Sequence, residues 1–365
     1  MEISVRIMSH PVRRRLANRV AAQAGPAEIV YDPDPWGNPG TLRTAAHAWA
    51  SMDPDATHHL LLQDDITLAP GFLDHVRMYA ESHPDLPIAF FTNWASRNGA
   101  VVRYAARAGA AGAWDVPEYV PTQALLLPDS VSSEFVDYVR RNPDSGLEDD
   151  DALRLFFAAV GTPLLLAVPN LVEHLSVRSV AGNDGHGDRA ASVFATDTEL
   201  PPPVPSVGRA SPAPAEPVVL PYFYKGRVWL YERDDDTVRG TSRMYWRKSA
   251  FEASAGVVGV DIAAVSEEYA AYLGTLSDSE TLALFSLCPP RALWSAWLAC
   301  YLLTAGSHLD AFEAGKPDGS LPTSRVGVRS LLVGGLAPEI PPHVVDKQSH
   351  LFFPLALAAM ESGTR

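Results

Sequence analysis

Two adjacent carboxylates, Asp64 and Asp65, end an apolar run in the segment HHLLLQDDITLAPGF, residues 58–72. The run predicts a buried strand, so the two acids fall at its carboxyl end. Parallel sheets bind ligands at that end, where loops carry charge without burying it, and carboxylate oxygens suit Mg²⁺ or Mn²⁺. The alternative is a solvated turn or a helix cap. Asp234 to Asp236 also follow a strand-like run, and there a hairpin turn is favoured.

A second acidic cluster stands in SGLEDDDALRLFFAAVG, residues 145–161, where Glu148, Asp149, Asp150 and Asp151 precede an apolar helical pattern. One acid is enough to cap a helix and complement its dipole, whereas four in a row repel one another. Crowded carboxylates have raised pKa values, which suits a general base. The cluster therefore indicates general-base chemistry, with helix capping as the alternative.

Two more polar segments follow predicted strands. His174 comes shortly after PLLLAVP, and a neutral imidazole is a common metal ligand, although a lone histidine is more often a satisfied polar residue. SHPVRRR follows the first predicted strand and contains His10, Arg13 and two further arginines. Arginines at a strand end can hold a phosphate or a base, and the alternative is a basic helix face.

Alternating strand and helix patterns must position these side chains in the first half of the chain. The alternation predicts an α/β fold with a mostly parallel sheet flanked by helices. Strands are predicted at Ile3–Met8, Glu28–Tyr31, Leu60–Leu62 and within residues 88–93, 124–128 and 163–169. Helices are predicted at Arg13–Ala24, Thr41–Met52, Phe72–Ser82, Ser130–Arg141 and Asp149–Val160.

The composition changes near Thr198, where a proline-rich stretch predicts a semi-rigid linker over residues 199–220. The expected organisation is one α/β domain over residues 1–198, this linker, and a smaller, mainly helical domain over residues 221–365 that begins with a hairpin. Helices are predicted there at Ile262–Leu273, Ser279–Leu287, Arg291–Thr304 and Gln348–Glu361.

The overall composition limits the function classes. The chain has 365 residues and a net charge of −14, which disfavours nucleic-acid binding. Cys288 and Cys300 form neither a zinc-binding spacing nor a disulfide framework, which favours a cytoplasmic protein. No signal peptide is expected, and the longest apolar stretch, Ala292–Ala305, is too short to cross a bilayer.

The order of these motifs resembles the GT-A class of nucleotide-sugar glycosyltransferases. HPVR is similar to a nucleotide-contacting Pro-x-Arg, QDD to the acidic D-x-D metal motif, and GLEDDD to the G-x-E-D-D segment of inverting members such as the β-1,4-galactosyltransferases. The histidine after a PN turn resembles that family's metal histidine. The QDD form also looks like bacterial and phage glycosyltransferase-like proteins. The resemblance covers residues 3–195 and implies a hexosyltransferase with a Rossmann-like sheet.

The resemblance implies a role for each candidate residue. Mn²⁺ or Mg²⁺ would be held by Asp65 and His174, with Asp64 on the ribose or behind the metal ligands. The catalytic base is assigned to Asp149, with Glu148 and Asp150 as rivals. Gln63 departs from the pattern, because the family usually has another acid there, which leaves a weakened metal site open. Nucleotide-binding candidates are His10, Pro11, Arg13, Asp32, Asp34, Arg43 and Asp64; for the aspartates, loop capping is the alternative.

The expected reaction moves a sugar from a nucleoside diphosphate, UDP being favoured, to an acceptor hydroxyl with inversion. The acceptor could be a natural product, a glycan or a peptide, and Thr122 and Gln123 are expected on its side. One alternative is a nucleotidyltransferase or sugar-nucleotide hydrolase with the same metal site, and another is a non-catalytic binding protein. The C-terminal stripe of Trp294, Trp297, Leu298 and Tyr301 could form a homodimer interface, although core packing is favoured.

Overall fold

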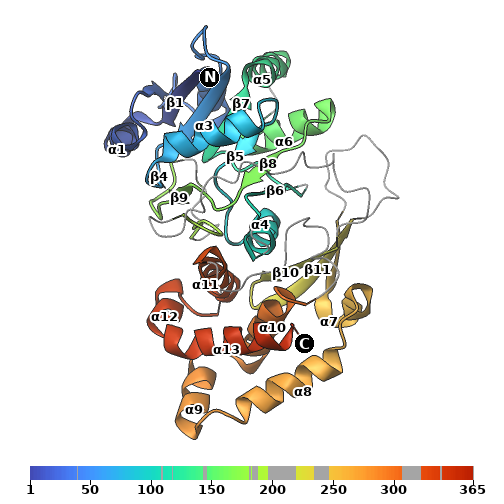
Figure 1. Cartoon of the computed structure of the whole chain (residues 1–365). Coiled ribbons are helices and arrows are strands. Elements are labelled where there is room, and N and C mark those ends of the chain that lie inside the picture. The colour runs from blue at the N-terminus through green and yellow to red at the C-terminus, as the bar shows by residue number, and fades with distance from the viewer. Residues whose placement is uncertain are drawn as a thin grey trace. The chain divides into compact units, whose positions relative to one another are not determined.

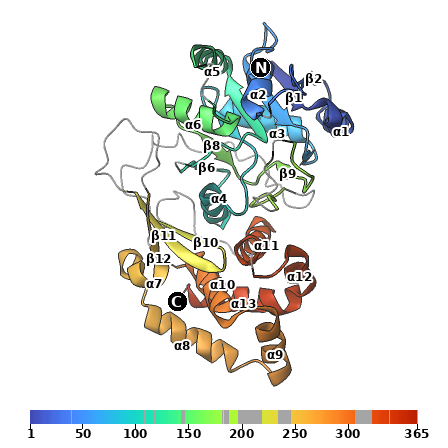
Figure 2. The same cartoon turned by 180° about the vertical axis from the view of Figure 1, so that it is seen from behind.

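The computed structural model describes most of the chain in two compact units (Figures 1 and 2). One unit comprises Met1–Asn93 and Ala111–Pro212, and the other comprises Trp94–Ala110 and Ala213–Arg365. The predicted linker, residues 199–220, lies outside the described residues except for its last two. The described residues are 1–38, 40–107, 110–116, 118–142, 146–180, 182, 188–195, 219–233, 246–305, 322–337 and 339–364.

The first unit is built on a seven-stranded mixed sheet with the order β2-β1-β3-β7-β5-β8-β6. Pairing is parallel between β1 and its neighbours β2 and β3 and between β5 and β8, whereas β7 and β6 are antiparallel to their partners. The strands are β1 Ile3–Ser9, β2 Glu28–Tyr31, β3 His58–Gln63, β5 Ile88–Ala89, β6 Gly112–Trp114, β7 Ala124–Pro128 and β8 Leu165–Ala167.

The mixed pairing departs from the mostly parallel sheet that the sequence predicts. The run ALLLP of β7 is buried at every position. A continuous apolar run indicates that both faces of a strand are covered, and it contains no information about strand direction. Strand β3, which ends at the motif of residues 63–65, belongs to the parallel group β2-β1-β3.

Helices cover both faces of this sheet. Side chains of α1 Arg14–Ala24 and α3 Phe72–Ser82 share one core cluster with Leu60 and Leu62 of β3. His59 points the other way and contacts Trp49 at the end of α2, which accords with the alternation of side chains along a strand. In Figure 1 helix α3 lies toward the viewer, and in Figure 2, seen from behind, helix α2 lies toward the viewer. On the α2 side lie α2 Thr41–Trp49, α5 Asp129–Arg141 and α6 Asp149–Val160.

A short two-stranded ribbon, not expected from the sequence, follows the acidic pair. It consists of β4 Ile66–Leu68 and β9 Val172–His174, paired antiparallel with Ile66 opposite His174. The backbone N–H of Leu175 donates to the carbonyl oxygen of Asp65 at 2.8 Å. This ribbon brings His174 beside Asp65 across more than a hundred intervening residues of sequence.

The second unit combines a three-stranded antiparallel sheet with helices. Its core includes Trp297, which is 1% exposed and contacts the rings of Tyr269 and Tyr272, so this member of the aromatic stripe packs inside the unit. None of the helices in the described part of the chain is long and apolar enough to cross a membrane. The elements are α4 Arg97–Arg107, β10 Val219–Tyr224, β11 Arg227–Arg233, β12 Trp246–Ala250, α7 Phe251–Ser254, α8 Ile262–Leu273, α9 Asp278–Leu287, α10 Pro290–Leu302, α11 Pro322–Leu336, α12 Pro342–Lys347 and α13 Ser349–Ser362.

Candidate functional site

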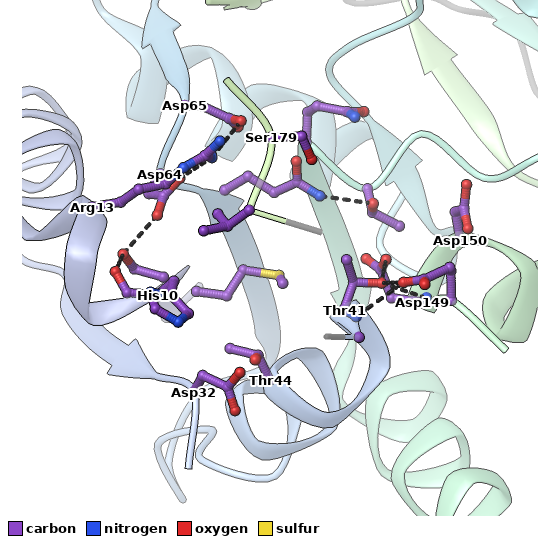
Figure 3. Close-up of a pocket in the computed structure, with 18 of the residues that line it drawn as sticks. His10, Arg13, Asp32, Thr41, Thr44, Asp64, Asp65, Asp149, Asp150 and Ser179 are labelled. Carbon is purple, nitrogen blue, oxygen red and sulfur yellow. Dashed lines mark hydrogen bonds and ion pairs between the residues drawn. The ribbon is translucent and has the colours of Figure 1, made fainter. Parts of the chain in front are cut away.

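A cavity of about 530 Å³ in the first unit gathers most of the predicted site residues (Figure 3). It lies where β1, β2 and β3 end and where α2 and α6 begin, so strand carboxyl ends and helix amino ends meet at one place. Two predicted residues, Pro11 and Asp34, do not line it. The predicted residues that do are His10, Arg13, Asp32, Arg43, Asp64, Asp65, Glu148, Asp149, Asp150 and His174.

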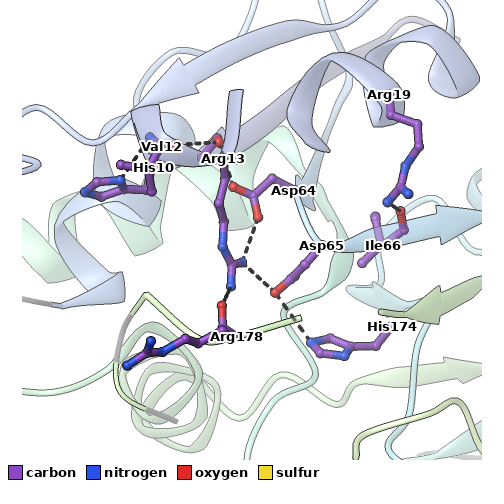
Figure 4. A network of polar contacts seen from close by, with 10 residues as sticks. His10, Val12, Arg13, Arg19, Asp64, Asp65, Ile66, His174 and Arg178 are labelled. Carbon is purple, nitrogen blue, oxygen red and sulfur yellow. Dashed lines mark hydrogen bonds and ion pairs between the residues drawn. The ribbon is translucent and has the colours of Figure 1, made fainter. Parts of the chain in front are cut away.

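The Asp64–Asp65 pair is joined by one guanidinium (Figure 4). Arg13 Nη1 donates to Asp64 Oδ1 at 2.9 Å and to Asp65 Oδ2 at 2.7 Å, and its Nη2 donates to the carbonyl oxygen of Arg178 at 2.5 Å. Ser9, which the sequence analysis did not single out, donates to Asp64 Oδ2 at 2.6 Å. The side chains of Arg13, Asp64 and Asp65 are only 13%, 6% and 9% exposed. The positive charge at this end of the cavity is therefore the guanidinium of Arg13.

Burial and neighbouring charge act against each other at this end. Burial raises the pKa of Asp64, and the charge of Asp65 adds to that rise, while the hydrogen bonds from Ser9 and Arg13 oppose it. Burial would lower the pKa of Arg13, but the two carboxylates outweigh it, and the pKa is raised. Arg13 therefore stays charged at neutral pH.

His10 holds the turn that directs Arg13 toward the acids. Its Nδ1 accepts from the backbone N–H of Val12 at 3.2 Å, and its Nε2 lies 2.8 Å from the carbonyl oxygen of Pro35. A neutral ring with the proton on Nε2 satisfies both contacts. Pro11 opens the same 3₁₀ turn, Pro11–Arg13, where its fixed backbone angle suits a first helical position. These two predicted nucleotide-binding residues thus shape the turn that carries Arg13.

Arg43 is bound by the loop that follows β2. Its Nε and Nη2 each lie 2.8 Å from an Asp32 carboxylate oxygen, and Nη2 also donates to the carbonyl oxygen of Asp34 at 2.7 Å. The hydrogen bond from Arg43 lowers the pKa of Asp32. Asp34 therefore contributes its backbone rather than its carboxylate, while Asp32 and Arg43 form one wall of the cavity.

Asp65 and His174 have the donor types that a metal site needs. His174 Nε2 lies 3.6 Å from Asp65 Oδ2, and burial lowers the pKa of His174, which favours the neutral, metal-binding form. Its Nδ1 is buried and makes no hydrogen bond to any described residue. Metal-bound histidines usually have a second hydrogen-bond partner that fixes the orientation of the ring. His174 has none among the described residues.

The donor set by itself is incomplete. Within the described residues no group of three or more His, Cys, Asp or Glu side chains converges as a metal site would require. The oxygen that faces His174, Asp65 Oδ2, is the one that Arg13 contacts. Asp65 and His174 therefore fit a divalent cation on two conditions: Arg13 must leave that oxygen, and a bound ligand such as a diphosphate must supply the remaining oxygens.

The second acidic cluster is organised by a hydroxyl instead of a cation. Thr41 Oγ1 lies 2.5 Å from both Glu148 Oε2 and Asp149 Oδ1, and the backbone N–H of Asp149 donates to it at 3.0 Å. The backbone N–H of Thr41 donates to Glu148 Oε2 at 2.9 Å. A hydroxyl has one proton and can donate to only one of the two carboxyls. Thr41 therefore ties both carboxyl groups to the amino end of α2.

Burial raises the pKa of two acids of this cluster, Asp149 and Asp150. Asp149 is 4% exposed, its Oδ2 makes no hydrogen bond to a described residue, and burial raises its pKa against the opposing effects of Thr41 and Thr122. Burial, followed by the charge of Asp149, raises the pKa of Asp150 to about 7. A carboxylate with a pKa near neutrality is the kind of group that serves as a general base.

The arrangement brings the Arg13-bound acidic pair and the acidic cluster around Thr41 to opposite sides of one cavity (Figure 3). The residues that organise both clusters, Ser9 and Thr41, were absent from the predicted site. The sequence could have indicated Thr41, because a Gly-Thr pair opens a predicted helix at residues 40–41. The sequence could not have indicated Ser9, because a serine between an apolar strand and a histidine forms no distinctive pattern.

Comparison with known proteins adds no relative: no protein-family model matches the chain, and no curated protein matches it.

Proposed function

We propose that this protein is a metal-dependent glycosyltransferase of the GT-A type, which transfers a sugar from a nucleoside diphosphate, with UDP favoured, to an acceptor hydroxyl. One observation carries the proposal: a single cavity holds the Arg13-bound acidic pair on one side and, on the other, the buried Asp149, which pairs with no described lysine or arginine. Glycosyl transfer needs both, since the leaving diphosphate gains charge while the acceptor loses a proton.

The donor side comprises Asp64, Asp65, Arg13 and His174. Asp65 and His174 would hold Mn²⁺ or Mg²⁺, and the ion, when bound, would stabilise the charge of the leaving diphosphate as a Lewis acid. Ser9 fixes Asp64 in one orientation, which suits a role on the ribose or behind the metal ligands. Arg13, once released from Asp65, would bind the phosphates through two N–H groups. His10, Asp32 and Arg43 form the adjoining wall where the nucleoside would lie.

The acceptor side comprises the amino end of α6 and the residues around it. Asp149 accepts the proton of the acceptor hydroxyl as that oxygen attacks the anomeric carbon on the face opposite the leaving group, which inverts the configuration. Thr41 holds Asp149 and Glu148 in place. Tyr119, Thr122 and Gln123 line the neighbouring part of the cavity and are the candidates for acceptor contacts.

A thermal-shift panel of nucleotide sugars, with and without Mn²⁺, tests the donor side. We expect at least one nucleotide sugar to raise the Tm of the wild type only when Mn²⁺ is present, and Asp65→Asn to abolish that rise. Asp74→Asn is the matched control, because Asp74 is an exposed aspartate on α3 whose contact is with Arg77, and the shift should persist in it. If no nucleotide sugar stabilises the wild type in a metal-dependent way, the proposal fails.

Product analysis separates transfer from the related chemistries. The donor that gives the largest shift is incubated with small panels of hydroxyl-bearing natural products, glycans and peptides, and both free and transferred sugar are measured. A transferred sugar of inverted configuration supports the proposal. Free sugar or sugar phosphate with every acceptor indicates a hydrolase, and donor binding without any turnover indicates a binding protein on this fold.

A further inference from the structure

The three-stranded sheet β10-β11-β12 of the second unit (Figure 2) has two unlike faces. Phe223, Val228 and Leu230 lie on one face and are 3%, 2% and 0% exposed, so that face packs into the core of the unit. The side chains that alternate with them lie on the other face, which is called the aromatic face below. Its rings are those of Tyr222, Tyr224, Trp229 and Tyr231.

Two exposed lysines lie over rings of the aromatic face. Lys248 Nζ is 3.8 Å from the centroid of the Trp229 ring, and Lys225 Nζ is 5.1 Å from the centroid of the Tyr224 ring. A ring face attracts a cation through its quadrupole. Trp229 Nε1 donates to the carbonyl oxygen of Tyr224 at 3.3 Å, which helps to fix the indole ring under Lys248. The rings therefore hold both ammonium groups in place.

A third cation lies over the same face. The Cζ of Arg97, at the start of α4, is 5.0 Å from the centroid of the Tyr231 ring, and Lys248 Nζ is 5.9 Å from that centroid. Burial, and then the positive charges of Lys225 and Arg97, lower the pKa of Lys248. The three cations are therefore close enough to repel one another.

The charge of the two lysines is not offset by a carboxylate of the described residues. Neither Lys225 nor Lys248 forms an ion pair or a hydrogen bond with any of them. In the first unit, by contrast, Arg13 and Arg43 are both bound by aspartates. Repelling cations that lack an acidic partner, in a chain of net charge −14, indicate a site for an anion from outside the protein.

The turn that contains Lys225 is fixed in place. Lys225 and Gly226 connect β10 to β11 and both have positive φ angles, 53° and 65°, as the central residues of a type I′ turn do. The backbone N–H of Gly226 donates to the carbonyl oxygen of Gly335 on α11 at 2.8 Å. Glu339 lies beside Gly226 but forms no ion pair with Lys225. The position of this lysine is therefore set before any ligand binds.

We propose that the aromatic face binds the phosphate group of a small phosphorylated ligand through Lys225 and Lys248, with Arg97 adding positive charge beside them. A phosphate monoester has about two negative charges and three acceptor oxygens, so it matches several cations at once better than a carboxylate does. Such a site is independent of sugar transfer, and it gives the second unit a ligand-binding role.

The same observations disfavour an extended polyanion as the ligand. The chain as a whole is acidic, so it repels a nucleic acid or an anionic membrane beyond the few cations of this face. Single-stranded nucleic acids also bind by stacking bases on open ring faces. Here the Trp229 ring already has an ammonium group 3.8 Å from its centroid. The face therefore offers charge rather than a stacking surface.

Titration calorimetry in the presence of EDTA tests the site, because the proposed donor cavity needs a divalent cation and this site does not. The probes are inorganic phosphate and glucose 6-phosphate, with glucose as the uncharged control. We expect both phosphate compounds to bind and glucose not to bind, and we expect Lys248→Gln to weaken the affinity about tenfold. Lys347→Gln removes an exposed lysine on α12 and should change the affinity less than about twofold.

Trp229→Leu distinguishes a built site from general attraction between charges. It keeps every cation but removes the ring under Lys248, so the affinity is expected to fall about threefold. Lys248→Arg keeps both the charge and the ring contact and should stay within about threefold of wild type. Equal losses in Lys248→Gln and Lys347→Gln, or no binding of either phosphate compound to the wild type, would overturn the proposal.

The indole N–H of Trp229 gives a readout at the site itself. In protein labelled with ¹⁵N-tryptophan, its NMR signal is identified by its loss in Trp229→Phe. Glucose 6-phosphate is expected to shift this signal with the dissociation constant found by calorimetry, and Lys248→Gln should weaken the response in parallel. Heat of binding without any shift of the Trp229 signal would place the phosphate elsewhere and refute the site.

Two further probes identify a different occupant. A single-stranded oligonucleotide, or vesicles that contain an anionic phospholipid, could bind more tightly than glucose 6-phosphate and lose that binding in Lys248→Gln. Either result would overturn the assignment to a small ligand. Phosphate binding at this face in a protein that binds no nucleotide sugar with Mn²⁺ would refute the proposed function and leave this site standing.

Discussion

The two acidic clusters of the cavity have similar sequences but opposite electrostatic environments. Asp64 and Asp65 share the Arg13 guanidinium, at 2.9 and 2.7 Å. Glu148 and Asp149 share the Thr41 hydroxyl, at 2.5 Å each, and no described arginine or lysine pairs with them. Asp64, Asp65 and Asp149 are buried, whereas Glu148 is exposed. A neutral hydroxyl offsets the desolvation of a carboxylate less than a guanidinium does, and burial raises the pKa of Asp149.

This difference gives each cluster a separate chemical capacity. A carboxylate pair that is organised around a positive charge can exchange that charge for another cation. A buried acid with a raised pKa can take up and release a proton near neutral pH. The following four predictions test the contrast, beginning with the largest expected effect.

Removal of the proposed base is expected to have the largest effect. Asp149→Asn keeps the shape of the side chain but cannot accept the acceptor proton, so kcat is expected to fall about a thousandfold with donor affinity unchanged. Steady-state kinetics and donor titration measure the two quantities separately. Asp137→Asn, an exposed change on α5, is the control. Retained turnover in Asp149→Asn would move the base to Glu148 or Asp150.

Removal of the shared cation is expected to destabilise the fold. Arg13→Gln leaves two buried carboxylates unpaired and is expected to lower the free energy of unfolding by about 3 kcal/mol in urea denaturation. Mn²⁺ is expected to raise the Tm of this variant more than that of wild type, because the ion no longer competes with the guanidinium. Arg14→Gln, on the exposed neighbour, should lie within about 0.5 kcal/mol of wild type. A Tm that does not respond to Mn²⁺ in Arg13→Gln would argue against exchange of cations at this end.

The pH dependence of turnover should report the raised pKa of the base. Burial raises the pKa of Asp149 and brings that of Asp150 to about 7. The base must be ionised to act, so kcat/KM is expected to fall about tenfold per pH unit as pH drops below the raised pKa of Asp149. A profile measured from pH 5 to pH 9 checks this. A rate that stays level down to pH 5 would indicate a base with an ordinary carboxylate pKa.

The smallest effect is expected on stability from Asp150→Asn. The folded-state pKa of Asp150, about 7, lies above its ordinary value of 3.8, so the folded protein retains a proton that the unfolded chain releases. Wild type therefore loses stability as pH rises from about 4 to about 7, and the neutral variant avoids this loss. At pH 8 the variant is expected to be about 1–2 kcal/mol more stable, after allowance for solvent screening. A gain in the free energy of unfolding of Asp150→Asn that is the same at pH 4 and pH 8 would contradict this prediction.

The sequence anticipated much of the first unit. Predicted helices at Phe72–Ser82 and Asp149–Val160 and the strand at Glu28–Tyr31 are observed with the same bounds, because amphipathic periodicity and turn residues define them locally. The short elements β4, β6 and β9 and helix α4 were not predicted. Strands of three residues contain too little pattern to be recognised, and their existence depends on partners far away in sequence.

The sequence by itself determined the inventory of the cavity: the acidic motif after β3, the acidic start of α6, His174, and the basic turn after β1. These follow from local rules, since strand ends and helix starts are marked by their own residues. Their partners were decided only by the tertiary structure. Which acid pair receives Arg13, which receives Thr41, and where Gln63 directs its amide depend on contacts between residues 51 to 108 positions apart, and no local pattern records them.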